Sequence, residues 1–259
     1  MIIFALYNFK GGVGKTTAAV NLAYLSGKDG FKTLLWDLDA QSAATFYLDE
    51  EDSVNGSMKG LIQKKGELSH FIKPTKFKNL SFIPGHINNR NLDVDLSQTE
   101  RQKRKFQQIK AALKSEFKYV FLDCPPSMSQ TAEQVFKMAH FILIPLIPSP
   151  LSERTFGQIL NHFEEKGLDI RKLVPFFSMT DNRKALHRET IKKFRETYPK
   201  VLRSEIPTAS EIEKMGIHQA PVSKFDFPSK GSTAYRTLWQ ELKWFKKLTS
   251  RRLLSLRKK

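Results

Sequence analysis

The sequence predicts an α/β fold: a single domain in which a mostly parallel, twisted sheet lies between helices on both faces. Short apolar, β-branched or aromatic runs alternate with longer helical patterns along the 259 residues, as in parallel sheets whose strands are joined by helices. Most of the short runs are continuously apolar, which is typical of strands buried on both faces. The hydrophobic fraction of 40% is sufficient for a sizeable core.

Strands and helices are expected in alternation. The strands are Ile2–Tyr7, Thr33–Asp37, Leu80–Ile83, Tyr119–Asp123, Phe141–Ile147, Leu173–Met179 and a short one at Val201–Ile206. The helices are expected near residues 15–28, 98–117, 129–139, 152–166, 184–197 and 232–248. Ligands of such sheets bind at the carboxyl ends of the strands, so functional residues are expected directly after strands.

The first strand runs into a glycine-rich segment, NFKGGVGKTT at residues 8–17, and then into a helix. Glycines allow backbone N–H groups to point at phosphate oxygens, and the N-terminus of the helix adds a favourable dipole. Lys15 is placed to reach the β- and γ-phosphates, and the hydroxyl of Thr16 to ligate Mg²⁺. Lys10 would be repelled or unused unless more negative charge lies nearby, and one solution is a nucleotide on a facing subunit. The expected cradle is Lys10, Gly11, Gly12, Val13, Gly14, Lys15, Thr16 and Thr17.

Two further motifs end strands with carboxylates. Asp37 and Asp39 lie two residues apart, so their side chains point the same way, and they would repel a triphosphate unless Mg²⁺ intervenes. Asp37 could hold the metal directly or through water, and Asp39 could position the attacking water. The alternative is a pair of acids that cap the next helix. Asp123 ends an apolar strand in the form of a Walker B site, which predicts a place in the Mg²⁺ shell.

The charge is strongly basic and uneven. The chain has 43 Lys plus Arg and 26 Asp plus Glu, a net of +17, yet residues 1–60 carry −2. Basic residues gather in the stretches 101–118, 183–203 and 243–259. Such a balance indicates a polyanionic partner, either nucleic acid or an anionic membrane. The chain has no run of about 18 apolar residues that would span a bilayer, and we expect a cytoplasmic protein.

The segment KGGVGKTT at residues 10–17 resembles the deviant Walker A box of the ParA/MinD family of dimerising ATPases. DLDAQ at 37–41 is similar to the family's first switch, with Ala40 where proline is usual, and DCPPS at 123–127 to its second switch. The resemblance is greatest to small, Soj-like ParA partitioning ATPases without an N-terminal DNA-binding domain. It implies a P-loop ATPase domain over residues 1–248, followed by a basic C-terminal tail at 249–259.

The resemblance implies ATP and Mg²⁺ as cofactors and slow hydrolysis that a ParB-like or adaptor protein stimulates. It also implies an ATP-dependent sandwich homodimer in which Lys10 reaches the partner's ATP. The catalytic candidates are Lys10, Lys15 and Asp39. An "IP…PV" segment like the family's begins at Ile206. It makes Pro207 an adenine contact, with Met179 as a weaker candidate. The metal candidates are Thr16, Asp37 and Asp123.

The function implied is that of a nucleoid-associated ATPase that binds DNA without sequence preference and positions a plasmid, a chromosome or a protein cluster. Nonspecific DNA binding needs cations on phosphates rather than base-reading geometry. Chromosome-segregating members often carry a DNA-binding arginine where this chain has Glu211. The basic surface is therefore expected from other residues, namely Arg183, Lys184, Arg188, Lys230, Arg251 and Arg252.

The main alternative is a membrane-cycling ATPase of the MinD type that uses the basic C-terminal tail. Apolar residues at 235, 238, 239, 242 and 245 recur at helical spacing, and we expect them to dock the last helix on the core. The segment 250–259 is short for an interfacial anchor, so a membrane partner is less favoured than DNA. Cys124 is the single cysteine, which argues against relatives that carry a metal cluster on paired cysteines.

Overall fold

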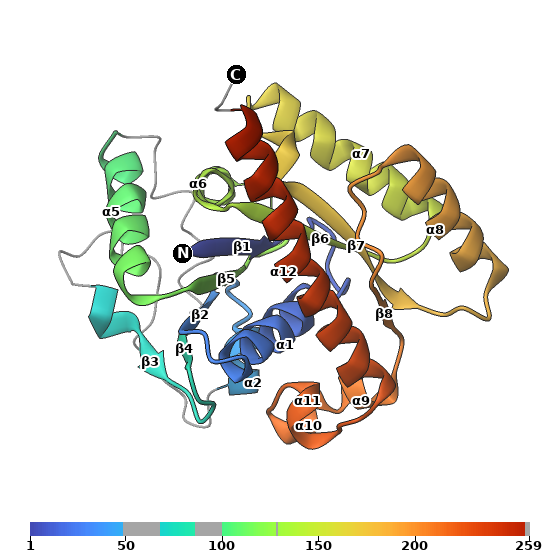
Figure 1. The fold of residues 1–259 in the computed structure, drawn as a ribbon, viewed down its shortest axis with the longest axis horizontal. Coiled ribbons are helices and arrows are strands. Elements are labelled where there is room, and N and C mark those ends of the chain that lie inside the picture. Colours follow the sequence, from blue (N-terminus) through green and yellow to red (C-terminus); the bar gives the residue numbers. More distant parts are fainter. Residues whose placement is uncertain (49–67, 86–99, 128, 257–259) are drawn as a thin grey trace.

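A computed structural model of the chain describes residues 1–48, 68–85, 100–127 and 129–256, and describes residues 100–103 and 246–256 by their backbone alone. An eight-stranded sheet runs through it, with helices on both faces (Figure 1). The strands are β1 (Ile2–Leu6), β2 (Thr33–Asp37), β3 (Lys73–Pro74), β4 (Leu80–Ile83), β5 (Tyr119–Asp123), β6 (Phe141–Leu146), β7 (Leu173–Thr180) and β8 (Glu205–Pro207).

The strand order is β3-β4-β2-β5-β1-β6-β7-β8, which places the first strand in the interior of the sheet between β5 and β6. All neighbouring strands are parallel except the pair β3 and β4. The predicted mostly parallel sheet is therefore confirmed. Parallel pairing brings the carboxyl ends of β1, β2, β5 and β7 to one edge, where the predicted functional residues follow them.

The helices divide between the two faces of the sheet. The first face is covered by α5 (Glu100–Glu116), α6 (Gln130–Met138), α7 (Pro150–Glu165) and α8 (Ala185–Thr197). The second face is covered by α1 (Lys15–Lys28), α2 (Ala43–Leu48), α9 (Ser210–Glu213), α10 (Met215–His218), α11 (Val222–Phe225) and α12 (Lys230–Leu256). Two short 3₁₀ turns are η1 (Leu68–Phe71) and η3 (Ile170–Lys172).

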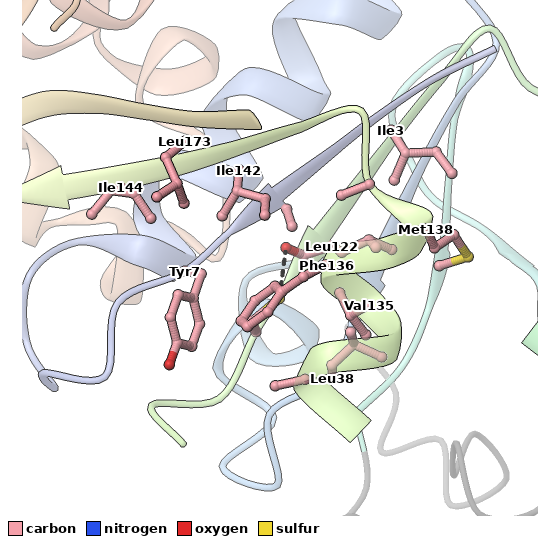
Figure 2. Packing of buried hydrophobic residues seen from close by; sticks show 14 of the residues in the cluster. Ile3, Tyr7, Leu38, Leu122, Val135, Phe136, Met138, Ile142, Ile144 and Leu173 are labelled. Atoms are coloured by element: carbon pink, nitrogen blue, oxygen red, sulfur yellow. Dashed lines mark hydrogen bonds between the residues drawn. The ribbon is translucent and has the colours of Figure 1, made fainter. Parts of the chain in front are cut away.

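Each face has its own apolar core. On the first face, residues from β1, β5, β6 and α6 interdigitate (Figure 2). The ring of Tyr7 meets that of Phe136 edge to face at 4.6 Å. On the second face, the last helix docks through Tyr235, Leu238, Trp239 and Leu242, all of which are buried. The prediction that this apolar stripe packs on the core is thus confirmed.

The local sequence explains where the central helices begin. Ser129 caps α6 by accepting a hydrogen bond from the backbone N–H of Ala132. Ser149 caps α7 in the same way, and Pro150 follows at the first helical position, where its missing N–H costs nothing. The first helix differs, because Gly14 stands at its N-cap and supplies no side-chain acceptor. Its first N–H groups are therefore left for another partner.

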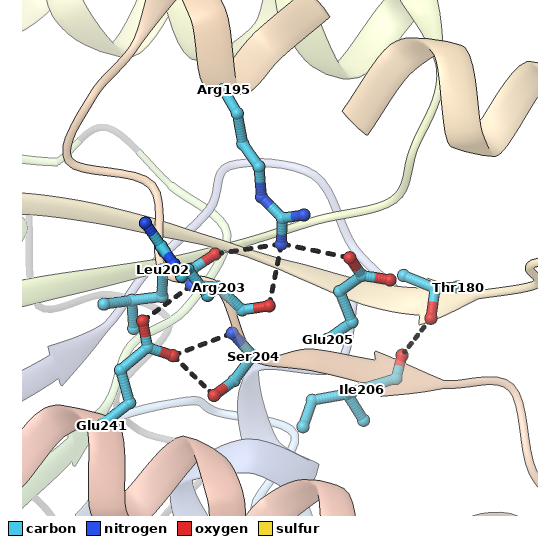
Figure 3. Close-up of polar contacts among 8 residues, drawn as sticks. All are labelled: Thr180, Arg195, Leu202, Arg203, Ser204, Glu205, Ile206 and Glu241. Carbon is cyan, nitrogen blue, oxygen red and sulfur yellow. Dashed lines mark hydrogen bonds and ion pairs between the residues drawn. The ribbon is translucent and has the colours of Figure 1, made fainter. Parts of the chain in front are cut away.

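The short strand predicted at Val201–Ile206 is wrong over its first four residues, since β8 begins only at Glu205. Before β8, the N–H of Leu202 donates to the carbonyl of Pro175 in β7 at 2.9 Å, and side chains hold the neighbouring residues (Figure 3). Arg195 of α8 donates to the carbonyl of Arg203 at 2.8 Å and pairs with Glu205 at 3.0 Å. Glu241 of α12 accepts from the backbone N–H groups of Arg203 and Ser204. Residues 202–204 thus connect two helices to the sheet edge.

The last helix continues to Leu256, past the predicted end at residue 248. No glycine or proline follows Gly231, so the sequence contains no strong stop signal there. The backbone of α12 therefore runs through most of the segment expected as a basic tail, and the division at residue 248 stays a prediction. None of the helices in the described part of the chain combines the length and the apolar composition that crossing a bilayer would require.

Candidate functional site

The glycine-rich loop between β1 and α1 forms an open cradle. Gly12 and Gly14 have φ values of 70° and 87°, in the left-handed region that side chains disfavour. A Cβ atom at Gly11 or Gly12 would meet nothing within 4 Å, whereas one at Gly14 would lie 2.9 Å from the hydroxyl of Ser178. The loop is thus open on one side and closely packed on the other. Since the first turn of α1 contains no acidic residue, its N–H groups are available to an anion.

Lys15 lies inside the cradle. Its side chain is largely buried, and its Nζ donates to the carbonyl of Lys10 at 3.1 Å. Burial lowers the pKa of this amine, while the nearby carboxylates of Asp123 and Asp39 act in the opposite direction. An ammonium held next to an open loop of N–H groups favours a ligand with several negative charges.

Asn8 fixes the loop to the sheet, a role that the sequence pattern did not reveal. The residue is buried, its Nδ2 donates to the carbonyl of Pro145 at 2.9 Å, and its Oδ1 accepts from the N–H of Lys10 at 2.9 Å. Lys10 itself is half-buried. Within the described residues, its side chain forms no ion pair.

Asp37 is a buried carboxylate that the surrounding loop binds through hydrogen bonds. The carboxylate is buried, and both of its oxygens accept hydrogen bonds from the protein. Oδ1 accepts from the N–H of Asp39 at 3.1 Å, and Oδ2 accepts from the N–H and the hydroxyl of Thr45 at 3.0 and 2.9 Å. Burial raises the pKa of Asp37 to about 6, and these hydrogen bonds oppose the rise. Asp37 therefore anchors the loop that carries Asp39, and its place in the Mg²⁺ shell, directly or through water, stays a prediction.

Asp123 is the carboxylate whose surroundings favour a bound cation. It is in register with Asp37 across β5 and β2 and is fully buried. Neither of its oxygens has a well-formed hydrogen bond among the described residues, and the Thr16 hydroxyl is a donor placed to make one. Burial raises its pKa well above the usual range, Asp37 adds to the rise, and the neighbouring Thr16 hydroxyl and Lys15 ammonium lower it. A buried carboxylate without hydrogen bonds is costly unless a cation compensates it. Asp123 and Thr16 therefore fit a magnesium ion.

No group of three or more His, Cys, Asp or Glu side chains gathers as a metal site within the described ranges. Mg²⁺ itself keeps several waters and is usually held by one or two protein ligands together with phosphates. Asp39 stands at the rim of the same site. It is half-buried, and its Oδ1 accepts from the N–H of Gln41 at 3.0 Å.

The two neighbouring aspartates should respond in opposite ways to amidation. Asp123→Asn relieves the repulsion between the two buried carboxyl groups of Asp123 and Asp37, so we expect the melting temperature of the nucleotide-free protein to rise, by about 2–4 °C for each 1 kcal/mol gained. Asp37→Asn places an NH₂ group against the donors of Asp39 or Thr45, so its melting temperature should fall. Calorimetry without nucleotide or Mg²⁺ measures both. A destabilised Asp123→Asn variant would contradict the assignment of Asp123 as the open ligand.

The adenine candidates lie at the same edge of the sheet as the cradle. Met179 has a φ of 54° at an irregularity between β7 and β8, and its side chain is turned outward and partly exposed. Such bulges redirect side chains next to functional sites. Pro207 of β8 lies in register with Thr180 of β7, the residue that follows Met179. Ser178 of β7 packs against the glycine-rich loop at Gly14. It thus connects the adenine candidates with the cradle.

The DNA candidates on the first face gather where β7 joins α8. Arg183 makes a two-pronged ion pair with Asp181, with both contacts at 2.9 Å. Lys184 is exposed at the N-cap of α8, and Arg188 donates to the carbonyl of Asn182 at 2.7 Å. Lys230 is exposed at the start of α12. The side chains of Arg251 and Arg252 lie outside the described residues.

Glu211 has a structural partner that accounts for an acid at this position. Its Oε1 accepts from the N–H of Gly231 at 2.9 Å, in the first turn of α12. A carboxylate there satisfies an orphan donor and complements the helix dipole. A Cβ at Gly231 would approach a side-chain carbon of Ile212 to 2.6 Å, so α9 and the start of α12 are in close contact. An arginine at 211 would lose this cap.

Comparison with known proteins agrees with this geometry. A family model described as an AAA domain matches residues 1–174. The sporulation initiation inhibitor protein Soj of Bacillus subtilis is 27% identical over 246 residues, 93% of this chain and 97% of that protein. Two solved structures superpose with a TM-score of 0.78 each. One is a putative plasmid partition protein of Borrelia burgdorferi bound to AMPPNP, 18% identical, with 93% of this chain and 97% of that chain covered. The other is cobyrinic acid a,c-diamide synthase of Mycobacterium smegmatis with a bound ATP analogue and magnesium, 25% identical, with 93% of each chain covered.

Proposed function

This chain belongs to the AAA domain family, and we propose on that premise that it is a Mg²⁺-dependent ATPase whose ATP-bound dimer binds DNA and positions or segregates a cargo. The resemblance to the ParA/MinD ATPases, and to the small Soj-like proteins among them, is confirmed by the relatives. ATP and Mg²⁺ match the residues at the site. Hydrolysis is slow in this proposal, and a ParB-like or adaptor protein stimulates it.

One observation carries the proposal: an open loop of N–H groups that contains a buried lysine lies beside Asp123, a buried carboxylate with no well-formed hydrogen bond among the described residues. Lys15 and the start of α1 would bind the phosphates, and Thr16 and Asp123 would hold the cation. When bound, Mg²⁺ would offset the charge that develops on the phosphates during transfer. Asp39, at the rim, would orient the attacking water.

The DNA part of the proposal rests on charge. Phosphate binding that ignores sequence needs only suitably placed cations, and the whole positive excess lies outside the first 60 residues, which carry −2 of the net +17. The membrane alternative has one observation in its favour: Trp244 on α12 is 66% exposed. A paired sedimentation assay with plasmid DNA and with anionic liposomes, each with ATP and with ADP, separates the two. We expect the protein to sediment with DNA in the presence of ATP and not to sediment with liposomes. Binding to liposomes and not to DNA would favour the membrane-cycling alternative.

Arg183 offers a sharper test, because the chain contains a matched control. Arg171 makes the same two-pronged pair with an aspartate two residues earlier, Asp169, but it precedes β7 while Arg183 follows it. Arg183→Ala should weaken DNA binding at every sequence and reduce the slope of log affinity against log salt by about 1. Arg171→Ala should leave both quantities unchanged. Equal effects of the two variants in a fluorescence anisotropy titration would refute the proposed DNA surface at the start of α8.

A further inference from the structure

Thr45 of α2 lies at the centre of a hydrogen-bonded cluster behind Asp39. Its hydroxyl donates to Asp37 Oδ2 at 2.9 Å and accepts from the N–H of Gly85 at 2.7 Å. Its backbone N–H donates to the same carboxylate oxygen at 3.0 Å. One hydroxyl therefore connects the end of β2, the start of α2 and the residues that follow β4. From this geometry we propose that Thr45 is a positioning residue for ATP hydrolysis, a role that rests on the proposed function.

The contacts continue from Thr45 to Asp39. Asp37 Oδ1 accepts from the N–H of Asp39 at 3.1 Å, and the carbonyl of Asp39 accepts from the N–H of Ser42 at 3.1 Å. The backbone of Asp39 is thus fixed on both sides, and Thr45 holds the carboxylate that fixes one of them. A residue meant to orient a water molecule must be held to within a fraction of an ångström.

The loop between Asp39 and Thr45 is strained, so it needs such support. Ser42 has a φ of 53°, in the left-handed region that favours glycine. Residues in such conformations persist only where surrounding structure over-determines them. Gly85 closes the loop from the other side: a Cβ there would lie 2.8 Å from both Asp37 Cγ and the carbonyl oxygen of Asp39. Only glycine can approach this closely without displacing the loop.

Valine tests the hydroxyl, because it keeps the shape of threonine and removes both hydrogen bonds of Oγ1. Thr45→Val should lower kcat by about tenfold or more while the affinity for ATP changes by less than about threefold. Thr45→Ser keeps the hydroxyl and should behave like the wild type. Thr197→Val is the control, since among the described residues that hydroxyl bonds within α8, to the carbonyl of Lys193. Gly85→Ala should displace the same loop and lower kcat in the same way, which gives a second variant if Thr45→Val folds poorly.

A measurement without nucleotide separates this inference from the proposed function. Hydrogen exchange of the segment 37–48 should be faster by about tenfold or more in Thr45→Val than in Thr45→Ser. In the valine variant, Asp37 loses the hydroxyl donor and the loop loses its hydrogen bond with Gly85. Unchanged exchange in Thr45→Val would overturn the inference, as would a Thr45→Ser variant as slow as Thr45→Val in hydrolysis. A wild-type chain that fails to hydrolyse ATP would overturn the proposed function. The exchange comparison would still show whether the Thr45 hydroxyl stabilises the loop.

Discussion

Lys15→Ala is expected to weaken ATP binding by about a hundredfold or more, which corresponds to about 2.7 kcal/mol. Lys15 is the largely buried ammonium inside the cradle, and charge-assisted contacts of such a group with phosphates contribute about 1.5–3 kcal/mol each. Isothermal titration with ATP and Mg²⁺ measures the change.

The control for this variant is Lys32→Ala, an exposed lysine directly before β2. It should bind ATP like the wild type. Removing the Lys15 ammonium leaves the carbonyl of Lys10 without this donor and takes a cation away from the buried Asp123, so circular dichroism should first establish that the Lys15→Ala variant is folded. A folded Lys15→Ala variant with undiminished affinity would refute the assignment of the phosphate site.

Lys10→Ala is expected to retain ATP binding by the monomer and to lose ATP-dependent dimerisation. The backbone of Lys10 serves its own cradle: its N–H donates to Asn8 and its carbonyl accepts from Lys15. Alanine keeps both contacts, so the affinity for ATP should change by less than about tenfold. The side chain of Lys10 is half-buried, and we expect its ammonium to reach the nucleotide of a second chain.

Light scattering of the Lys10→Ala variant with ATP and Mg²⁺ should give the mass of one chain, whereas the wild type should give that of two. Lys28→Ala, at the other end of α1, is a suitable control for the loss of a positive charge. A variant that dimerises with ATP as the wild type does would show that Lys10 does not act across subunits.

Much of the architecture could be predicted because local patterns and the sheet agree. The helix expected at residues 15–28 has these bounds in the structure, since the glycine loop defines its start. Asp37 and Asp123 were predicted to lie at one edge because each ends a buried strand, and parallel pairing places them in register. The sequence also indicated the docking face of the last helix, whose apolar spacing continues over several turns.

The parts that could not be predicted depend on contacts between distant residues. Asn8 anchors the loop to a carbonyl 137 positions away, and Thr45 receives a hydrogen bond from Gly85, 40 positions on. Neither contact leaves a periodic signal. The sequence placed Asp37 in the metal shell, and its hydrogen bonds with Thr45 became visible only in the fold. The short helices α9, α10 and α11 have too few turns to show amphipathic spacing.

Asp39→Ala supplies the most direct test of the central claim that ATP converts the chain into a DNA-bound dimer. This variant should hydrolyse ATP very slowly and therefore stay in its ATP-bound form. Its affinity for a duplex of random sequence, measured by fluorescence anisotropy at one fixed salt concentration, should be at least about tenfold higher with Mg·ATP than with Mg·ADP. Equal affinities with the two nucleotides, or no binding to DNA with either, would contradict the claim.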